Sequence, residues 1–280
     1  MTDSGTPVAG ANVDFSTTST GAAFGGTSSC TTGADGSCSV TVTKPDFGLV
    51  DVTAQSSVPT TAGGTSSTPV GSSTHTVAFQ APWLIAPVAT SPPAVTVGRN
   101  GADLDVEVNG TTTARPADTV KTLAITTPAN SALTVDKTAG VIAAPITING
   151  GGGTTSLEVK GDTATWTVDH ATGAGAITTP TADLTLSFTN IWTLKATGAD
   201  HTLAGPATDT TWVLSAQGSG TMAASASSGG TVTYSGFTNL KGAPDNQDVF
   251  KVDTGGKIAG TIDGGDRGFD TMEIVGSHAS

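Results

Sequence analysis

Hydrophobic and polar residues alternate along much of the chain in short runs typical of β-strands. In Val40-Thr41-Val42-Thr43 both valines fall on one face of an extended segment, because successive side chains of a strand point to opposite faces. Similar runs predict strands at residues 11–16, 39–44, 48–55 and 75–80, with glycine, proline or aspartate between them. We therefore expect an all-β protein.

The composition narrows the classes of partner. The chain has 280 residues, 37 of them glycine, and carries 11 basic against 23 acidic residues, a formal net charge of −12. Phosphate backbones are neutralised by clustered lysine and arginine, and here the basic residues are scattered, so we expect no nucleic-acid partner. The best apolar run, residues 83–89, is short and interrupted by proline, which excludes a membrane-spanning segment of that kind.

The distribution of proline and small polar residues predicts two domains. Residues 1–80 are expected to form a β-sandwich in which the Ser/Thr/Gly-rich stretch 57–74 is a loop. Residues 81–98 contain four prolines and predict a semi-rigid linker, and residues 99–280 form the second segment. Trp83 is expected to dock on a neighbouring sheet or, if exposed, to bind a ligand.

The two cysteines are eight positions apart. Cys30 and Cys38 flank Ala34-Asp35-Gly36, a turn signal that would bring them together across a hairpin. A disulfide is expected in an oxidising compartment, which agrees with an extracellular location; a pair of free thiols is the alternative. Without a nearby histidine the pair is a poor zinc site.

The first segment resembles a known family in three ordered blocks. TDSGTPVAGANVDFS, CTTGADGSCSVTVT and FGLVDVTAQ are similar to bacterial immunoglobulin-like domains of the invasin and intimin type. The resemblance implies an immunoglobulin-like sandwich that serves as a spacer or an adhesive module and brings no catalytic residues. The strand that precedes the first block in this family is missing, which implies a truncated domain inside a longer chain, with neighbouring domains as partners.

The second segment contains an internal repeat. TATWTV and TTWVL place Trp166 and Trp212 46 residues apart, and the later F-T-N blocks place Phe188 and Phe237 49 apart. The repeat, especially residues 229–274, resembles repeats of very long bacterial surface and secreted proteins. This implies a parallel β-solenoid, or β-helix-like stack, with about 20–25 residues per coil and about two coils per repeat. Tandem antiparallel sandwiches are the alternative.

One acidic turn is a candidate metal site. Asp263, Asp266 and Asp270 lie in DGGDRGFD, which resembles a calcium-binding nonapeptide but has one extra residue between glycines. Residues 242–248 are a further-degraded second copy. The resemblance implies a possible Ca²⁺ site; turn geometry alone is the alternative.

No catalytic constellation is visible. The four histidines are isolated and expected to be solvated or at strand edges, and the chain has three glutamates and one tyrosine. We expect a non-enzymatic, adhesin-like protein on a bacterial surface or secreted from it, in contact with a surface glycan or a host or cell-surface protein. The alternative is a carbohydrate-active β-helix enzyme, a polysaccharide lyase or hydrolase, with carboxylates on one face.

Overall fold

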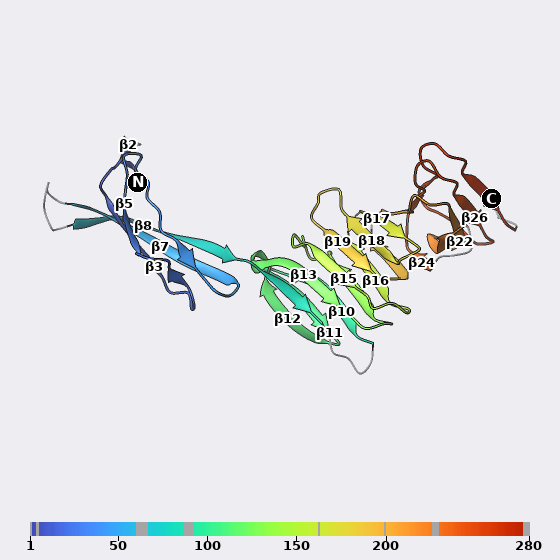
Figure 1. The fold of residues 1–280 in the computed structure, drawn as a ribbon, viewed down its shortest axis with the longest axis horizontal. Coiled ribbons are helices and arrows are strands. Elements are labelled where there is room, and N and C mark those ends of the chain that lie inside the picture. The colour runs from blue at the N-terminus through green and yellow to red at the C-terminus, as the bar shows by residue number, and fades with distance from the viewer. Residues whose placement is uncertain are drawn as a thin grey trace. The chain divides into compact units, whose positions relative to one another are not determined.

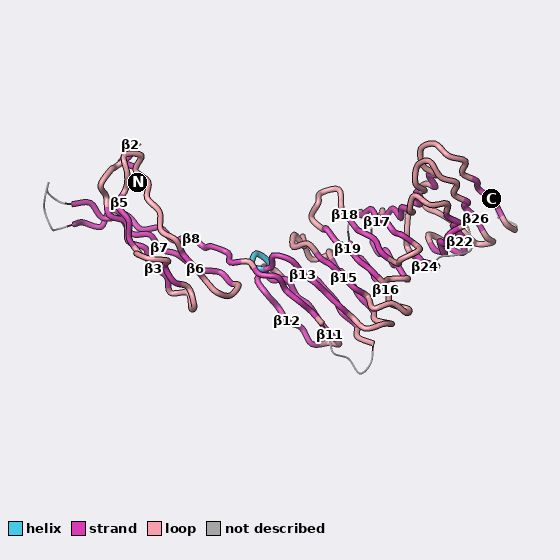
Figure 2. The backbone as a smooth tube through the Cα atoms, in the orientation of Figure 1, coloured by secondary structure: helices cyan, strands magenta, loops and turns pink. Residues whose placement is uncertain are grey.

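The regular secondary structure of the described residues consists almost entirely of β-strands, joined by loops and turns (Figure 2). The computed structural model describes residues 2–3, 6–59, 67–86, 92–161, 163–198, 200–225 and 230–276. Within those ranges the one helix is a three-residue 3-10 turn, Ala117–Thr119, and no helix has the length and apolar character to cross a membrane. The chain divides into two compact units, Met1–Ala81 and Pro82–Ser280. The expected all-β class is confirmed.

The first unit is built on a four-stranded antiparallel sheet in the order β5-β3-β7-β8, with two further two-stranded sheets, β4-β6 and β1-β2. Its strands are β1 (Thr2–Asp3), β2 (Thr6–Pro7), β3 (Asn12–Thr17), β4 (Ala23–Phe24), β5 (Ser29–Thr31), β6 (Val42–Thr43), β7 (Gly48–Pro59) and β8 (Ser67–Phe79). The expected strands at 11–16, 48–55 and 75–80 are present. The one expected at 39–44 is reduced to β6, and β7 and β8 extend into both ends of the stretch 57–74 expected to be a loop.

The core of the first unit is small, and a buried hydroxyl supports it. Ala11 and Val50 are fully buried. The Thr32 hydroxyl accepts the Ala11 amide at 2.9 Å and donates to the carbonyl of Val8 at 2.6 Å. This threonine therefore holds the segment before β3 against the segment after β5, where little apolar area is available to do so.

The second unit consists of two large, mostly parallel sheets. The first sheet has eleven strands in the order β12-β11-β10-β14-β16-β20-β24-β23-β22-β26-β28, and the second has nine, β27-β25-β21-β17-β18-β19-β15-β13-β9. The strands of the first sheet are β10 (Ala94–Asn100), β11 (Asp103–Val108), β12 (Thr111–Pro116), β14 (Ala132–Asp136), β16 (Ser156–Gly161), β20 (Thr193–Gly198), β22 (Thr210–Ala216), β23 (Ser219–Ala224), β24 (Thr231–Ser235), β26 (Val249–Val252) and β28 (Thr271–Ile274). Those of the second are β9 (Ala81–Ile85), β13 (Val120–Thr126), β15 (Ile146–Asn149), β17 (Ala164–Asp169), β18 (Ala174–Thr178), β19 (Thr185–Thr189), β21 (His201–Ala204), β25 (Asn239–Lys241) and β27 (Ile262–Asp263).

From β13 onward the chain passes alternately through the two sheets, with the three-stranded meanders β17-β18-β19 and β22-β23-β24 each taking the place of one pass. Successive passes therefore stack as coils; Figure 1 shows β13, β15 and β19 side by side. Leu123 of β13 pairs with Ile146 of β15, and Phe250 of β26 pairs with Met272 of β28. These offsets fit the expected length of about 20–25 residues per simple coil. Because most neighbours are parallel, the alternative of tandem antiparallel sandwiches is wrong for this unit.

The expected linker contributes strands to the second unit. β9 and β10 lie within residues 81–98 or begin there, and join the second and first sheets respectively. Trp83, Val95 and Val97 are buried in the core. Trp83 therefore packs against a sheet, which was the first of the two expectations for it. The residues around it pack inside the second unit and do not form a linker between two units.

The tryptophan repeat is real but comprises one and a half coils. Trp166 lies in the antiparallel meander β17-β18-β19 of the second sheet, and Trp212 in the matching meander β22-β23-β24 of the first. After β19 the chain makes two single passes, β20 and β21, before the next meander begins. One pass through either sheet is half a coil, and a meander counts as one pass. A meander and two single passes therefore make three half-coils, so the meanders of consecutive repeats lie in opposite sheets. The expectation of two coils per repeat is wrong.

The aromatic residues in the last strand of each meander also correspond differently from the sequence expectation. Phe188 pairs with Gly175, and Tyr234 pairs with Gly220. A Cβ on Gly175 would collide with the Phe188 ring, and one on Gly220 would lie 3.0 Å from the Tyr234 hydroxyl oxygen. The counterpart of Phe188 is thus Tyr234 and not Phe237, so the F-T-N blocks that suggested the longer spacing are out of register in the structure.

Candidate functional site

The disulfide is present. Cys30 and Cys38 are joined, with their Cα atoms 5.9 Å apart. Between them Gly36 takes a φ of 73°, and Asp35 accepts hydrogen bonds from the amide and hydroxyl of Ser37 at 3.0 and 2.7 Å. These bonds lower the pKa of Asp35, the hydroxyl bond having the larger effect. The expected Ala-Asp-Gly turn therefore forms, although only Cys30 lies in a strand.

The two acidic turns stack directly on one another. Residues 242–248 and 264–270 each connect the second sheet to the first, and Lys241 pairs with Asp263 just before them. Asp245 and Arg267 take the same left-handed conformation, with φ of 62° and 63°, and their side chains form an ion pair at 3.0 Å. The second copy that the sequence suggested therefore lies one coil before the first.

Two aspartates of these turns form a hydrogen-bonded ladder. Asp248 accepts the amide of Thr210 through Oδ1 at 2.9 Å, and Asp270 accepts the amide of Asp248 in the same way at 2.9 Å. Asp248 is fully buried, and Asn246 donates to it at 3.0 Å. Burial raises the pKa of Asp248, and the neighbouring Asp270 carboxylate acts in the same direction. The arrangement ties each coil to the next.

The three predicted calcium ligands point to different partners. Asp263 accepts the amide of Gly265 at 3.0 Å and lies 3.6 Å from Lys241 Nζ. Asp270 takes part in the ladder, and Asp266 is exposed. Among the described residues no group of three or more histidine, cysteine, aspartate or glutamate side chains is arranged to hold a metal. The side chains as placed do not fit a calcium ion. That these residues serve turn geometry alone stays a prediction.

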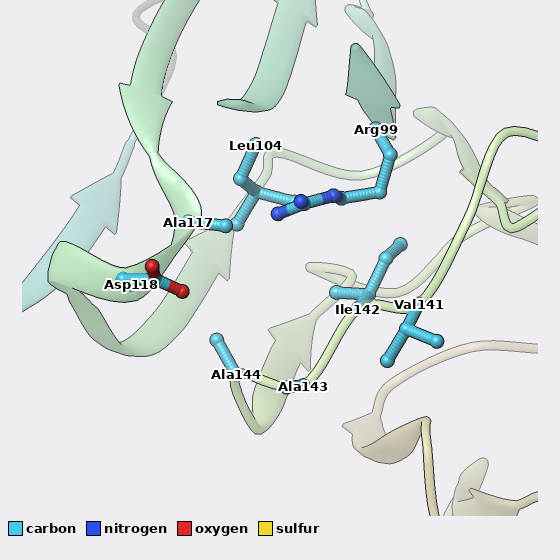
Figure 3. Close-up of a pocket in the computed structure, with 8 residues that line it drawn as sticks. All are labelled: Arg99, Leu104, Ala117, Asp118, Val141, Ile142, Ala143 and Ala144. Atoms are coloured by element: carbon cyan, nitrogen blue, oxygen red, sulfur yellow. The ribbon is translucent and has the colours of Figure 1, made fainter. Parts of the chain in front are cut away.

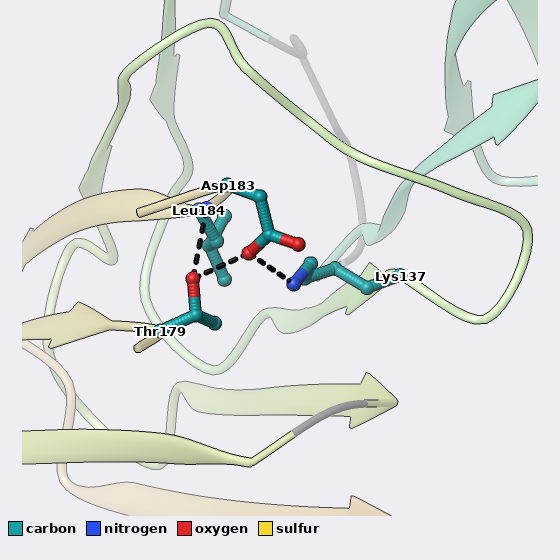
Figure 4. Close-up of polar contacts among 4 residues, drawn as sticks. All are labelled: Lys137, Thr179, Asp183 and Leu184. Carbon is teal, nitrogen blue, oxygen red and sulfur yellow. Dashed lines mark hydrogen bonds and ion pairs between the residues drawn. The ribbon is translucent and has the colours of Figure 1, made fainter. Parts of the chain in front are cut away.

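A buried ion pair that no sequence motif indicated lies elsewhere in the second unit (Figure 4). Lys137 Nζ lies 2.7 Å from Asp183 Oδ1, and the lysine side chain is 1% exposed. The Thr179 hydroxyl donates to the same carboxylate and accepts the amide of Leu184 at 3.2 Å. The bond from Lys137, followed by that from Thr179, lowers the pKa of Asp183 to about 2. This cluster joins the loop after β14 to the loop before β19.

Two of the histidines, expected to be solvated or at strand edges, lie at strand ends but are buried. His201 is 0% exposed and its Nδ1 accepts the indole N–H of Trp166 at 3.4 Å. His170 is also buried, 3.4 Å from the Thr208 hydroxyl, at a pocket of about 630 Å³ that Asp169 and Asp209 also line. Burial lowers the pKa of both imidazoles. Both rings are therefore neutral parts of the core near pH 7.

Arg99 lines two small hollows. One, of about 220 Å³, is lined by Leu104, Asp118 and residues 141–144, and Figure 3 shows the guanidinium reaching across it. The other, also about 220 Å³, lies over Gly98 on the outer face of the first sheet. Its charged lining residues are Arg99, Asp105, Glu107 and Asp136. It gathers carboxylates on one face, and no aromatic residue lines it.

Comparison of the chain with protein-family models, with curated proteins and with solved structures found no match.

Proposed function

We propose that this chain is a non-enzymatic, adhesin-like module of a bacterial surface or secreted protein, in which an immunoglobulin-like sandwich precedes a β-solenoid. Its function is to act as an extended spacer that displays neighbouring domains, and to contact a surface glycan or a protein on another cell. The proposal includes an extracellular location, which the disulfide supports.

The observation that carries the proposal is the continuous stack of coils in the second unit. Apolar side chains from successive coils form uninterrupted buried rows, such as Trp166, Leu203 and Leu240 across the second sheet. The outward positions hold short polar side chains and in-register charge pairs, among them Glu158 with Lys195 at 3.0 Å. A stack of this kind transmits load along its axis through many parallel ladders and presents a long polar face.

A binding and turnover assay tests the proposal. The purified chain is applied to immobilised polysaccharides and to intact host cells, and both retention and soluble products are measured. We expect retention on at least one surface without release of new reducing ends or unsaturated sugars. Failure to bind any surface would contradict the adhesive role, and product release would contradict the non-enzymatic one.

The hollow over Gly98 supports one second candidate, a carbohydrate-active enzyme. Asp105, Glu107 and Asp136 provide the acidic groups that glycoside hydrolysis requires. If this candidate is correct, product release occurs and is abolished by Asp105→Asn or by Asp136→Asn. Loss of product in neither variant would remove the hollow from consideration.

A further inference from the structure

Trp192 is the one tryptophan of the chain that is partly exposed. Trp83, Trp166 and Trp212 are buried, whereas Trp192, just before β20, packs against the core and still reaches the surface. An indole at the surface offers a ligand a large, flat and amphipathic contact area. Trp192 is therefore a candidate contact for a ligand.

The backbone around Trp192 holds its ring in a fixed place. A Cβ on Gly230 would collide with the six-membered part of the indole, and one on Gly173 would lie 3.0 Å from its Cε2 atom. Both positions therefore require glycine, and Gly173 also takes a left-handed φ of 62°. The carbonyl of Trp192 accepts the amide of Thr233 at 2.8 Å. A ring held in this way loses little conformational freedom when a ligand binds.

The ring lies at a hollow of about 400 Å³ whose other lining residues are glycines and threonines. They are Gly153, Thr154, Thr193, Gly230, Thr231 and Thr233. Thr193 of β20 pairs in register with Thr233 of β24, and Thr231 lies two positions earlier on the same face of β24. Within the described part of the chain, the hydroxyls of these three threonines have no hydrogen-bond partner. Three hydroxyls thus lie together beside the indole.

The lining of this hollow restricts the class of ligand. The described residues that form it include no ionisable group, so an anionic ligand would find no cation there. The net charge of −12 would also repel such a ligand. A lipid or an apolar peptide would find one aromatic ring among threonines. A neutral sugar fits both parts of the lining, because its C–H groups stack on the negative face of an indole and its hydroxyls bond with threonine hydroxyls.

We propose that this hollow is a binding subsite for a neutral saccharide unit of a surface glycan. Trp192 is its stacking platform, and Thr193, Thr231 and Thr233 supply its hydroxyl contacts. The proposal rests on the adhesive function proposed above and names the place and the class of sugar through which that function acts. It concerns a different surface from the hollow over Gly98, which gathers carboxylates and has no aromatic residue in its lining.

Titration of the full chain with defined polysaccharides tests the proposal. The neutral probes are dextran, laminarin, mannan and galactan, and the anionic probes are alginate and polygalacturonate. We expect saturable binding of at least one neutral probe with a Kd of about 1 mM or lower per sugar unit. Because no charge takes part, the Kd should be the same between about 50 mM and 500 mM NaCl. Binding of the anionic probes alone, or binding that salt abolishes, would overturn the proposal.

Two readouts with variants of Trp192 locate the bound sugar. Affinity electrophoresis should show at least a tenfold loss of affinity in Trp192→Ala and retention of most of it in Trp192→Phe, which keeps an aromatic ring. Tryptophan fluorescence should change when the parent binds and stay constant when Trp192→Phe binds, because the other tryptophans are buried in the core. Parent affinity in Trp192→Ala would overturn the proposal, as would a fluorescence change that persists in Trp192→Phe.

Trp192 also packs against the core, so a second variant tests the hollow through exposed residues alone. Thr231→Val with Thr233→Val removes two hydroxyls at exposed positions of β24 and keeps the β-branched shape that strands favour. We expect an unchanged melting temperature and at least a tenfold loss of affinity. Thr165→Val, at an exposed position of β17 outside this hollow, is the matched control and should bind like the parent. Equal affinities of the double variant and the control would overturn the proposal.

Retention on intact host cells separates this proposal from the adhesive function on which it rests. If the parent and Trp192→Ala are retained on cells equally and no neutral probe binds, the subsite is wrong and the adhesive function stands. If the parent binds neither a probe nor a cell, both are wrong. Retention of the parent that Trp192→Ala loses and that the bound neutral probe competes away supports both.

Discussion

Trp166 and Trp212 occupy equivalent places in consecutive repeat units, yet one lies in the second sheet and the other in the first. Each is fully buried and pairs with an apolar residue of the next coil, Leu203 and Phe250 respectively. Trp212 lies in the opposite sheet from Trp166 because each repeat contains an odd number of half-coils. Each sheet therefore contains one of the two tryptophan meanders, and the first sheet also has the antiparallel strands β10-β11-β12 at its end. The apolar rows remain continuous on both sides.

The glycines opposite the repeat aromatics should be intolerant of substitution. In Gly220→Ala the new Cβ would collide with the carbonyl of Val213 and lie 3.0 Å from the Tyr234 hydroxyl oxygen. We expect a loss of about 1–3 kcal/mol in the free energy of unfolding, measured by denaturant titration. Gly98→Ala is the matched control, since its Cβ would be 3.5 Å from the nearest atom, an ordinary contact, and it should change stability little. Equal losses would contradict the close packing of the aromatic residue over its glycine.

The disulfide should stabilise the first unit. Replacing Cys30 and Cys38 together by serine removes a short covalent loop, and we expect the free energy of unfolding of the first unit to fall by about 2–3 kcal/mol. Thermal unfolding of this unit, followed separately from the second by hydrogen exchange, is the measurement. The second unit should be unaffected, so a matching fall there would count against an effect confined to the first unit.

The buried ion pair should be costly to break from either side. Asp183→Asn leaves the Lys137 ammonium buried with its strongest acceptor gone, and should cost about 3 kcal/mol in the free energy of unfolding. Lys137→Met with Asp183→Leu removes both charges and should recover most of that loss. Urea titration of the two variants at pH 7 decides the point. If the double variant is less stable than Asp183→Asn, the ion pair itself is stabilising and this reasoning fails.

The same pair predicts a pH dependence. The folded-state pKa of Asp183, about 2, lies below its ordinary value of 3.8, so its contribution to stability is present above pH 3.8 and lost as the pH falls toward 2. The difference in stability between the parent and Asp183→Asn should therefore shrink over this window. A constant difference down to pH 2 would contradict the assignment.

Calcium and magnesium should act alike on this chain. Asp263 and Asp270 are already engaged by Lys241 and by the Asp248 amide, so added ions should only screen the acidic surface. We expect equal, small increases in melting temperature with Ca²⁺ and with Mg²⁺ at the same ionic strength. An increase selective for Ca²⁺ that Asp263→Asn with Asp270→Asn abolishes would restore the calcium site.

Local patterns predicted the strands, the disulfide turn and the tryptophan repeat, because alternation, turn residues and spacing are properties of neighbouring positions. The sheet to which each repeat's meander belongs was not predictable, because the spacing of residues in the sequence does not show how many half-coils separate two repeats. Lys137 and Asp183 are 46 residues apart, and no short-range signal connects them. Asp263, Asp266 and Asp270 are close in sequence, yet a turn between strands sends them to three different places. Asp248, the buried member of the ladder, is recognised only once the coil that pairs it with Asp270 is known.

Zero-length cross-linking with a carbodiimide tests the coil register most directly, because it acts on the unmodified protein. Three in-register pairs bring an ammonium close to a carboxylate on the adjacent coil: Glu158 with Lys195 at 3.0 Å, Lys241 with Asp263 at 3.6 Å, and Lys251 with Glu273 at 3.4 Å. Mass spectrometry of the digested protein should identify all three isopeptide bonds. Links of these lysines to other acidic residues, with none of the three predicted bonds found, would contradict the stacked-coil arrangement.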